Sequence, residues 1–412
     1  MHAFSPATCP RLIVKVGSSL LVTSDGQVRR DWLATLAADI AGRAEAGQQI
    51  AVVSSGAIAL GARRLKLPKG GRASLEDAQA AAATGQIALS QIWAELLDAV
   101  ALTAAQMLVT LDDLEDRRRY LNASATLNRL LMLGAVPILN ENDSVATEEI
   151  RFGDNDRLAA RIAQAAGAQG VVLLSDVDGL FDANPLTHPA ARLIDRVDRI
   201  DGAIESMAGA DSASGMGSGG MASKIAAARI ATGAGIALAI ASGRIDHPLA
   251  ALAATGRGTL FTAERGAGAR KAWLAGGLTA KGDISIDAGA VKALVSGKSL
   301  LAAGVTSVAG GFLRGDLVAI IGPGGTPVAR GLSEYDAVDA ARLCGTRSED
   351  QAAILGYAPR AALVHRNHMA ILRSSRLPAA QGLSVQGLPR GRSRPGIRCT
   401  YLLGAPNPRS PA

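Results

Sequence analysis

A stretch of seventeen residues, 140–156, carries the densest set of groups in this sequence that could bind a small polar molecule. It reads NENDSVATEEIRFGDND and follows an apolar run, AVPIL at 135–139, which is typical of a buried strand. Amide and carboxyl side chains are therefore concentrated directly after a strand: Asn140, Asn142, Asp143, Asp154, Asn155 and Asp156. In α/β proteins, ligands bind beyond the carboxyl ends of the strands. The stretch predicts a ligand site, and a solvated acidic loop is the alternative.

A glycine-rich segment, GMGSGGMASK at 215–224, precedes an alanine-rich run at 225–232 that predicts a helix, with Gly233 as a stop. Glycines let the backbone approach a ligand closely, and a helix start presents free N–H groups and the positive end of its dipole. Lys224 would lie in the first turn, where a positive charge is unfavourable unless an anion binds there. The segment therefore predicts a polyphosphate site.

Two shorter glycine patterns suggest other nucleotide sites, but neither has the context that its motif requires. Gly215, Gly217 and Gly220 have the spacing of a dinucleotide site, which needs a strand directly before it. The preceding residues, 206–214, predict a loop instead. GKS at 297–299 matches the end of a Walker A motif, whose earlier glycine would fall at Lys292. The sequence therefore favours neither a Rossmann site nor a classical P-loop.

Three further strand ends carry polar groups. In LIVKVGSS at 12–19, Lys15 lies within an apolar strand, although only eight of the 43 basic residues are lysine. A compact ammonium in that place suits a phosphate, and an edge-strand lysine facing water is the alternative. Ser54 and Ser55 follow another apolar run and could bind an anionic oxygen or cap the next helix. Ser175 and Asp176 could bind a base or ribose, or form an ordinary turn.

Taken in order along the chain, these segments resemble the amino acid kinase family, and within it the glutamate 5-kinases. The resemblance extends over residues 10–372 and rests on five segments: VKVGSS at 14–19, SSGAI at 54–58, NEND at 140–143, GDND at 153–156 and GGMASK at 219–224. Ser54 and Ser223 stand where threonine is expected in many relatives. The opening strand with its lysine and glycine is shared with aspartate, acetylglutamate and uridylate kinases, so a sister kinase acting on another acid remains an alternative.

The resemblance implies a role for each predicted site residue. Lys15 and Lys224 would contact the ATP phosphates, and Asp156 would orient both lysines, so these three form the implied catalytic set. The implied glutamate-binding residues are Ser55, Asp143 and Asn155, with Asn140 nearby. The implied ATP-binding residues are Lys15, Ser175, Asp176, Ser218, Gly219, Gly220, Met221, Ala222, Ser223 and Lys224.

The resemblance further implies ATP-dependent phosphorylation of the γ-carboxylate of L-glutamate to L-glutamyl 5-phosphate, the first step of proline biosynthesis, with feedback inhibition by proline. A γ-carboxylate is ionised at neutral pH and needs no general base, so catalysis would consist of positioning and charge neutralisation. Mg²⁺ would be held largely by ATP and water, and no residue is predicted as a metal ligand because the sequence has no Cys/His cluster.

Composition and periodicity predict two domains with different folds. Alternating strand and helix patterns between Arg11 and Arg257 predict a three-layer αβα sandwich with a mainly parallel sheet, here assigned to residues 8–262. Its core must be aliphatic, because only 3% of the 412 residues are aromatic. After a linker at 263–280, short alternating runs at 281–365 predict a small β-barrel-like domain that resembles a PUA domain.

The remaining features concern partners and location. Residues 373–412 contain seven arginines and no acid, which accounts for the whole net charge of +7, and predict a disordered tail. PUA domains bind RNA in other enzymes, but the segment 281–365 lacks a dense basic face, so RNA binding by an inactive kinase-like protein is the less favoured alternative. Scattered cysteines and the absence of a signal pattern or long apolar run predict a cytoplasmic protein without a membrane span. We also expect a homo-oligomer.

Overall fold

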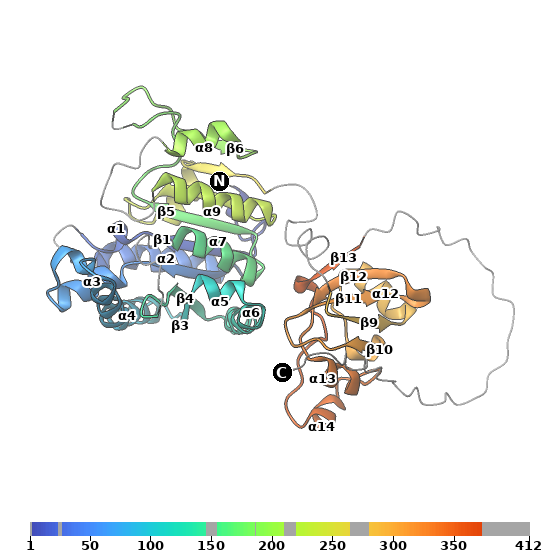
Figure 1. Ribbon diagram of the computed structural model, residues 1–412. Coiled ribbons are helices and arrows are strands. Elements are labelled where there is room, and N and C mark those ends of the chain that lie inside the picture. Colours follow the sequence, from blue (N-terminus) through green and yellow to red (C-terminus); the bar gives the residue numbers. More distant parts are fainter. Residues whose placement is uncertain are drawn as a thin grey trace, which may run out of the picture. The chain divides into compact units, whose positions relative to one another are not determined.

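The computed structural model describes residues 2–23, 27–145, 155–185, 187–209, 220–263 and 280–372. The chain divides into two compact units, Met1–Gly268 and Ala269–Ala412 (Figure 1). Most of the predicted linker and all of the predicted tail lie outside the described residues, so the domain boundaries proposed from the sequence remain predictions. No described helix has the length and hydropathy needed to span a membrane.

The first unit is built on an eight-stranded sheet. Its strands are β1 Arg11–Val16, β2 Gln49–Ser54, β3 Ala104–Val109, β4 Val136–Glu141, β5 Gly170–Ser175, β6 Arg196–Val197, β7 Ala237–Ser242 and β8 Thr259–Phe261. Their order is β3-β4-β2-β1-β5-β7-β8-β6, and every pairing is parallel except β7 with β8. The carboxyl ends of β1, β2, β4 and β5 therefore meet at one edge of the sheet.

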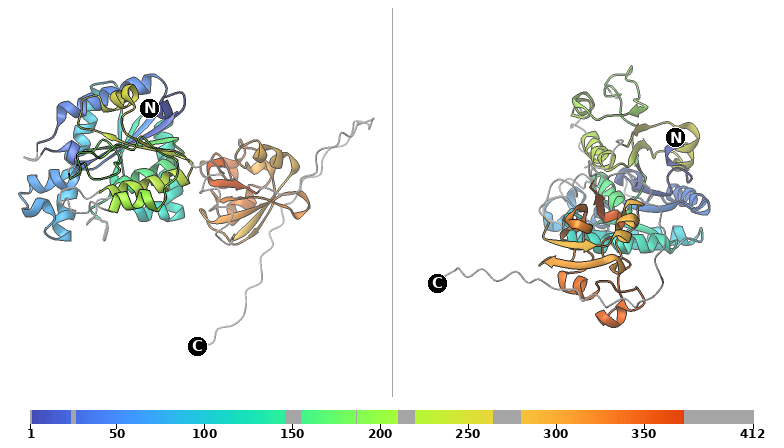
Figure 2. Two further views of the ribbon diagram at one scale, coloured as in Figure 1. Left: turned by 90° about the horizontal axis from the view of Figure 1, so that it is seen from above. Right: turned by 90° about the vertical axis from the view of Figure 1, so that its right-hand side faces the viewer.

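Helices cover both faces of this sheet. They are α1 Ser18–Leu21, α2 Arg30–Glu45, α3 Ala57–Arg64, α4 Leu75–Asp98, α5 Leu111–Glu115, α6 Arg117–Met132, α7 Asn155–Ala166, α8 Gly202–Gly209, α9 Met221–Gly233 and α10 Pro248–Thr255, with short 3-10 turns at His2–Phe4 and Pro68–Gly71. One hydrophobic core packs α2, α4 and α10 against the sheet, and a second packs α6, α7 and α9 against the other face (Figure 2, left). The predicted αβα sandwich is confirmed.

Alternation along β1 decides which face each side chain joins. Leu12, Val14 and Val16 belong to the core under α2 and α4, whereas Ile13 belongs to the core under α7 and α9. Because side chains alternate along a strand, Lys15 projects to the same face as Ile13. The lysine is thus directed toward the two helices that follow the predicted binding segments.

An unusually close helix pair, α3 and α4, borders the same edge of the sheet. A Cβ atom added at Gly61 would lie 1.7 Å from the carbonyl oxygen of Ala81, and one added at Gly85 would lie 1.8 Å from that of Ala57. Only hydrogen fits at these two positions, so glycine permits the backbones of the two helices to touch. The contact fixes where α4 places its polar side chains.

The second unit contains a separate five-stranded sheet. Its strands are β9 Gly282–Ile286, β10 Val305–Gly310, β11 Leu317–Ile321, β12 Pro327–Leu332 and β13 Met369–Ile371, in the order β10-β9-β11-β12-β13. All pairings are antiparallel except β9 with β11. The helices are α12 Ala288–Val295, α13 Ala337–Arg342 and α14 Gln351–Leu355, with 3-10 turns at Ala302–Gly304, Pro323–Gly325 and Arg366–His368. The predicted β-rich second domain is confirmed, and its last strand lies beyond residue 365.

Three local predictions were wrong. Neither Ser54 nor Ser55 caps α3, because the cap position is Gly56, whose φ of 105° favours glycine. The helix predicted from residue 225 begins four residues earlier, at Met221, and includes Gly233. Residues 206–209, predicted as loop, end helix α8, and residues 210–214 lie outside the described residues.

Candidate active site

A buried carboxylate holds two buried lysines at the carboxyl edge of the first sheet. Lys15 Nζ lies 2.5 Å from Asp156 Oδ1, and Lys224 Nζ lies 3.0 Å from Asp156 Oδ2. Each lysine is 6% exposed and Asp156 is fully buried. Two positive charges and one negative charge leave the cluster with a formal charge of +1, so a further anion would be attracted to it.

The three residues meet because three different elements converge. Lys15 comes from β1, Asp156 from the first turn of α7, and Lys224 from the first turn of α9. The two helices lie side by side over the sheet (Figure 1), where their apolar residues share one core. Packing of these apolar faces therefore brings together charges that are 68 or more residues apart in the sequence.

Electrostatics keep Asp156 ionised. Complete burial acts to raise the pKa of its carboxyl, but the ammonium groups of Lys15 and Lys224 outweigh this effect and hold that pKa below its ordinary value. The carboxylate therefore remains a fixed negative charge at neutral pH. It can orient both lysines without accepting a proton.

A row of hydrogen-bonded side chains, here called the amide line, lies beside this cluster. It consists of Ser55, Asn155, Asn140 and Gln86. Asn155, the neighbour of Asp156 in α7, donates from Nδ2 to Ser55 Oγ at 2.7 Å and to Asn140 Oδ1 at 3.0 Å. Asn140, at the end of β4, in turn donates from Nδ2 to Gln86 Oε1 on α4 at 2.9 Å. The loop after β2, the end of β4 and the middle of α4 are thus joined to the first turn of α7.

The side-chain oxygen of Asn155 is available to accept a hydrogen bond. Its Oδ1 is buried and makes no hydrogen bond among the described residues. A buried polar atom without a partner is costly, and such atoms often mark a place where a ligand binds. The atom would accept a hydrogen bond from a donor on a small molecule.

A polar cavity of about 270 Å³ opens next to the amide line. Its walls include the carboxyl groups of Glu141 and Asp143 and the side chain of Gln86. Burial raises the pKa of Asp143 to about 6, and the nearby positive charge of Arg72 opposes that rise. Two acids in one small cavity favour a ligand with a positive group, such as an ammonium.

The start of α9 presents backbone N–H groups to the same edge. Gly220 is the N-cap residue of this 13-residue helix and no side chain caps it, and Met221, Ala222, Ser223 and Lys224 form the first turn. Ser175 ends β5, the neighbour of β1 in the sheet, and its hydroxyl donates to Asp176 Oδ1 at 3.1 Å. The start of α9 carries Lys224, and β5 lies on the side of β1 away from β2 and β4. The predicted residues Ser218 and Gly219 lie outside the described residues.

One residue of this region, Gln86, escaped the sequence analysis. Gln86 is a buried glutamine in the alanine-rich helix α4, and that mismatch with its neighbours was the signal in the sequence. Ser54, which could bind an anion or cap a helix on sequence grounds, accepts a hydrogen bond from Trp93 Nε1 at 2.9 Å. It ties β2 to α4 and is fully buried.

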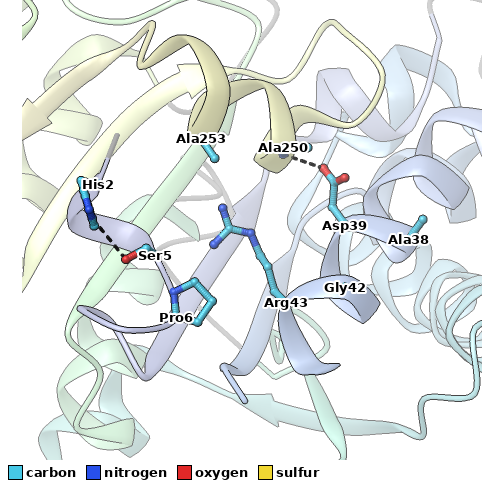
Figure 3. A pocket seen from close by; sticks show the side chains of 9 residues that line it. All are labelled: His2, Ser5, Pro6, Ala38, Asp39, Gly42, Arg43, Ala250 and Ala253. Atoms are coloured by element: carbon cyan, nitrogen blue, oxygen red, sulfur yellow. Dashed lines mark hydrogen bonds between the residues drawn. The ribbon is translucent and has the colours of Figure 1, made fainter. Parts of the chain in front are cut away.

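A larger cavity, about 590 Å³, lies at the opposite edge of the sheet, where β1 and β2 begin (Figure 3). Its central cation, Arg43, donates to the carbonyl oxygens of Phe4 and Leu249 and to Gln48 Oε1. Its acid, Asp39, accepts from the backbone N–H groups of Leu249 and Ala250. These groups fasten the N-terminal segment and α10 to the sheet. We therefore place the chemistry at the smaller, polar cavity rather than here.

Comparison with known proteins gives the same picture. The sequence profile of the Amino acid kinase family matches residues 10–242, and that of the PUA domain matches residues 282–355. The chain is 73% identical to a glutamate 5-kinase of Sphingopyxis alaskensis over 372 residues, covering 90% of this chain and 100% of that protein. It is 64% identical to a glutamate 5-kinase of Zymomonas mobilis, covering 90% and 93% of the two chains. The chain therefore belongs to the amino acid kinase family, and within it to the glutamate 5-kinases.

Proposed function

We propose that this kinase transfers the γ-phosphoryl group of ATP to the γ-carboxylate of L-glutamate, giving L-glutamyl 5-phosphate and so starting proline biosynthesis. The observation that carries the proposal is the position of Lys15, Asp156 and Lys224 directly beside the amide line from Ser55 to Asn140. A cationic cluster for a phosphoryl group and a set of polar groups for an amino acid meet at one strand edge. High identity to glutamate 5-kinases supports the same assignment.

The acceptor carboxylate needs no base. Its reference pKa of about 4.3 leaves it ionised at neutral pH, so the obstacle is repulsion between the carboxylate and the triphosphate. Lys15 and Lys224 would neutralise the transferring phosphoryl group and the leaving oxygen, since Asp156 holds both ammonium groups in place. Phosphoryl transfer depends mainly on positioning and electrostatic stabilisation, which is what fixed charges of this kind supply.

The amino-acid end of glutamate would be bound by the polar cavity and the amide line. Asp143 provides a negative charge for the α-ammonium group, and Asn155 Oδ1 provides a buried acceptor. Ser55 lies beside the end of β1, because its backbone N–H donates to the carbonyl oxygen of Val16. Its hydroxyl accepts a hydrogen bond from the amide of Asn155.

ATP would bind where α9 begins. The N-terminal N–H groups of α9 and the ammonium of Lys224 suit phosphate oxygens, and Ser175 and Asp176 suit the nucleoside. The described residues contain no group of three acidic, His or Cys side chains that could hold a metal. Asp156, the nearest acid, is already paired with two lysines. We expect Mg²⁺ to arrive with the phosphates and water, as its preference for oxygen ligands and retained water suggests, and to neutralise part of the triphosphate charge.

We also propose that proline inhibits the enzyme and that it works as a homo-oligomer in the cytoplasm. The first two parts have direct tests. Proline should raise the apparent KM for glutamate or lower kcat at saturating ATP. Sedimentation equilibrium would give the oligomeric state.

The reaction is tested by measuring ADP release over a panel of amino acids that includes L-glutamate, L-aspartate and N-acetyl-L-glutamate. Hydroxylamine in the assay would trap the acyl phosphate as a hydroxamate, which identifies the carboxyl group as the acceptor. We expect turnover with L-glutamate and a γ-hydroxamate product. Faster turnover with aspartate or acetylglutamate would replace the proposal with one of its sister activities.

A further inference from the structure

Two residues of α4, Gln86 and Ser90, determine which way the amides of the site point. An amide side chain has a donor end and an acceptor end, and only its hydrogen-bond partners decide which is which. Four successive side chains, Ser90, Gln86, Asn140 and Asn155, are linked end to end here. The direction of the whole series depends on the group at its start.

The series starts at a backbone carbonyl, which can only accept. Ser90 Oγ donates its single proton to the carbonyl oxygen of Gln86 at 2.8 Å. The hydroxyl can then only accept from Gln86 Nε2, 3.2 Å away, and this leaves Gln86 Oε1 to accept from Asn140. If the side-chain amide of Gln86 were turned by about 180°, its NH₂ group would face the NH₂ group of Asn140, and neither group could accept a hydrogen bond.

The series ends at the substrate site. Asn140 Oδ1 accepts from Asn155 Nδ2, so Asn155 must present its oxygen, not its nitrogen, as the remaining free end. That oxygen is the buried acceptor without a hydrogen bond among the described residues. It lies on the residue next to Asp156, which holds both lysines.

We propose that Gln86 and Ser90 are positioning residues that fix Asn155 Oδ1 as an acceptor for the α-ammonium group of the amino-acid substrate. They thereby favour an amino acid over a dicarboxylic acid of the same length that lacks the ammonium group. This inference rests on the proposed function, since it assumes that glutamate occupies the site. The two residues act on the substrate through Asn140 and Asn155.

The first test replaces Gln86 with leucine, which keeps the size of the side chain and removes both ends of the amide. We expect KM for L-glutamate to rise about tenfold or more, as for loss of a hydrogen bond to a charged group, and KM for ATP to stay within about twofold. The inhibition constant of glutarate, which lacks the ammonium group, should change by less than about threefold. Gln91→Leu is the matched control, because Gln91 lies on the same helix and is exposed.

The second test separates positioning from folding. Ser90→Ala removes the group that orients Gln86, whereas Ser90→Thr retains a hydroxyl at the same place. We expect Ser90→Ala to raise KM for glutamate several-fold and Ser90→Thr to restore it to near the wild-type value, with similar thermal unfolding midpoints for both. This pair gives the answer even if Gln86→Leu does not fold.

Three results would overturn the inference: an unchanged glutamate KM in Ser90→Ala, equal losses for Ser90→Ala and Ser90→Thr, or parallel weakening of glutamate and glutarate in a folded Gln86→Leu protein. Each would assign the two residues to folding alone. Wild-type activity is measured first in the same assay. Absence of glutamate turnover in the wild-type enzyme would instead refute the proposed function, so the two failures can be told apart.

Discussion

At the scale of single residues, the site depends on one carboxylate that forms ion pairs with two lysines. Asp156 pairs with Lys15 through one carboxyl oxygen and with Lys224 through the other. Removing one lysine leaves the carboxylate paired with the other, so the fold keeps a neutral buried pair. This asymmetry makes the lysines better probes of catalysis than Asp156, whose loss would leave two buried ammonium groups facing each other.

We predict that Lys224→Ala lowers kcat by about a hundredfold to a thousandfold, as for removal of one group that stabilises charge in a transition state. The thermal unfolding midpoint should change little, because Asp156 retains Lys15. Steady-state kinetics and calorimetry measure the two effects. Lys292→Ala, an exposed lysine of α12 in the second unit, is the control and should behave as wild type. A Lys224→Ala enzyme with near-normal turnover would exclude the assigned role.

On the acid side of the pH profile, kcat/KM for glutamate should follow the ionisation of Asp143. Its pKa of about 6 means that the side chain is neutral below that pH and negative above it. Only the negative form pairs with the α-ammonium of glutamate, so kcat/KM for glutamate should fall as pH drops through about 6, approaching tenfold per pH unit. Glutamate itself keeps its charges in this window.

The same fall should disappear in Asp143→Asn, whose kcat/KM should be low and nearly independent of pH between 5 and 7, about the range where this carboxyl titrates. Asp112→Asn, an exposed acid at the start of α5, is the matched control and should retain the wild-type profile. A persistent inflection near pH 6 in Asp143→Asn would move the titration to another group.

At the scale of elements, the sequence located strands and their polar ends far better than it located contacts between helices. Apolar runs such as 136–139 and 170–174 are buried throughout, so hydropathy identified β4 and β5. β3 lies at the sheet edge and is mostly exposed or half-buried, so its weak pattern gave no signal. Gln86 binds Asn140, which lies 54 positions further along the chain, and local spacing cannot reveal such a partner.

The contact between α3 and α4 gives a prediction at this scale. Gly61→Ala should destabilise the first unit by about 3 kcal/mol, because the added methyl group would overlap the Ala81 carbonyl and force the helices apart. KM for glutamate should rise as well, since α4 carries Gln86. Calorimetry of the unfolding transition and substrate kinetics test both effects.

Gly42→Ala provides the matched control for that substitution. Gly42 lies inside α2 with no neighbouring atom within 4 Å of an added Cβ, so alanine should stabilise this helix by about 0.5–1 kcal/mol. A loss of stability in Gly61→Ala together with a gain in Gly42→Ala would support the close-contact explanation. Equal small effects would mean that α3 and α4 can separate without cost.

At the scale of the whole molecule, net positive charge is concentrated in the last forty residues of the sequence. The sequence carries a net charge of +7, and residues 373–412 contribute seven arginines without an acid. Residues 280–372 of the second unit contain nine basic and eight acidic residues, and ion pairs such as Lys281 with Asp316 and Arg314 with Glu334 use several of them. The PUA domain therefore offers little net attraction for a polyanion, and any such attraction should come from the last forty residues.

We predict that ending the chain at Leu372 leaves phosphotransfer unchanged and that single-stranded RNA binds the shortened chain more weakly, and with less salt dependence, than the full chain. Each phosphate contact contributes about 0.7 to the slope of log affinity against log salt, so losing seven arginines should lower that slope by up to about 5. Filter binding between about 50 and 200 mM salt would measure it, and a full-length chain with all seven arginines changed to glutamine separates charge from length. RNA binding that stays tight at about 150 mM salt in the shortened chain would instead assign recognition to the PUA domain, because the arginines that could supply unspecific attraction would be gone.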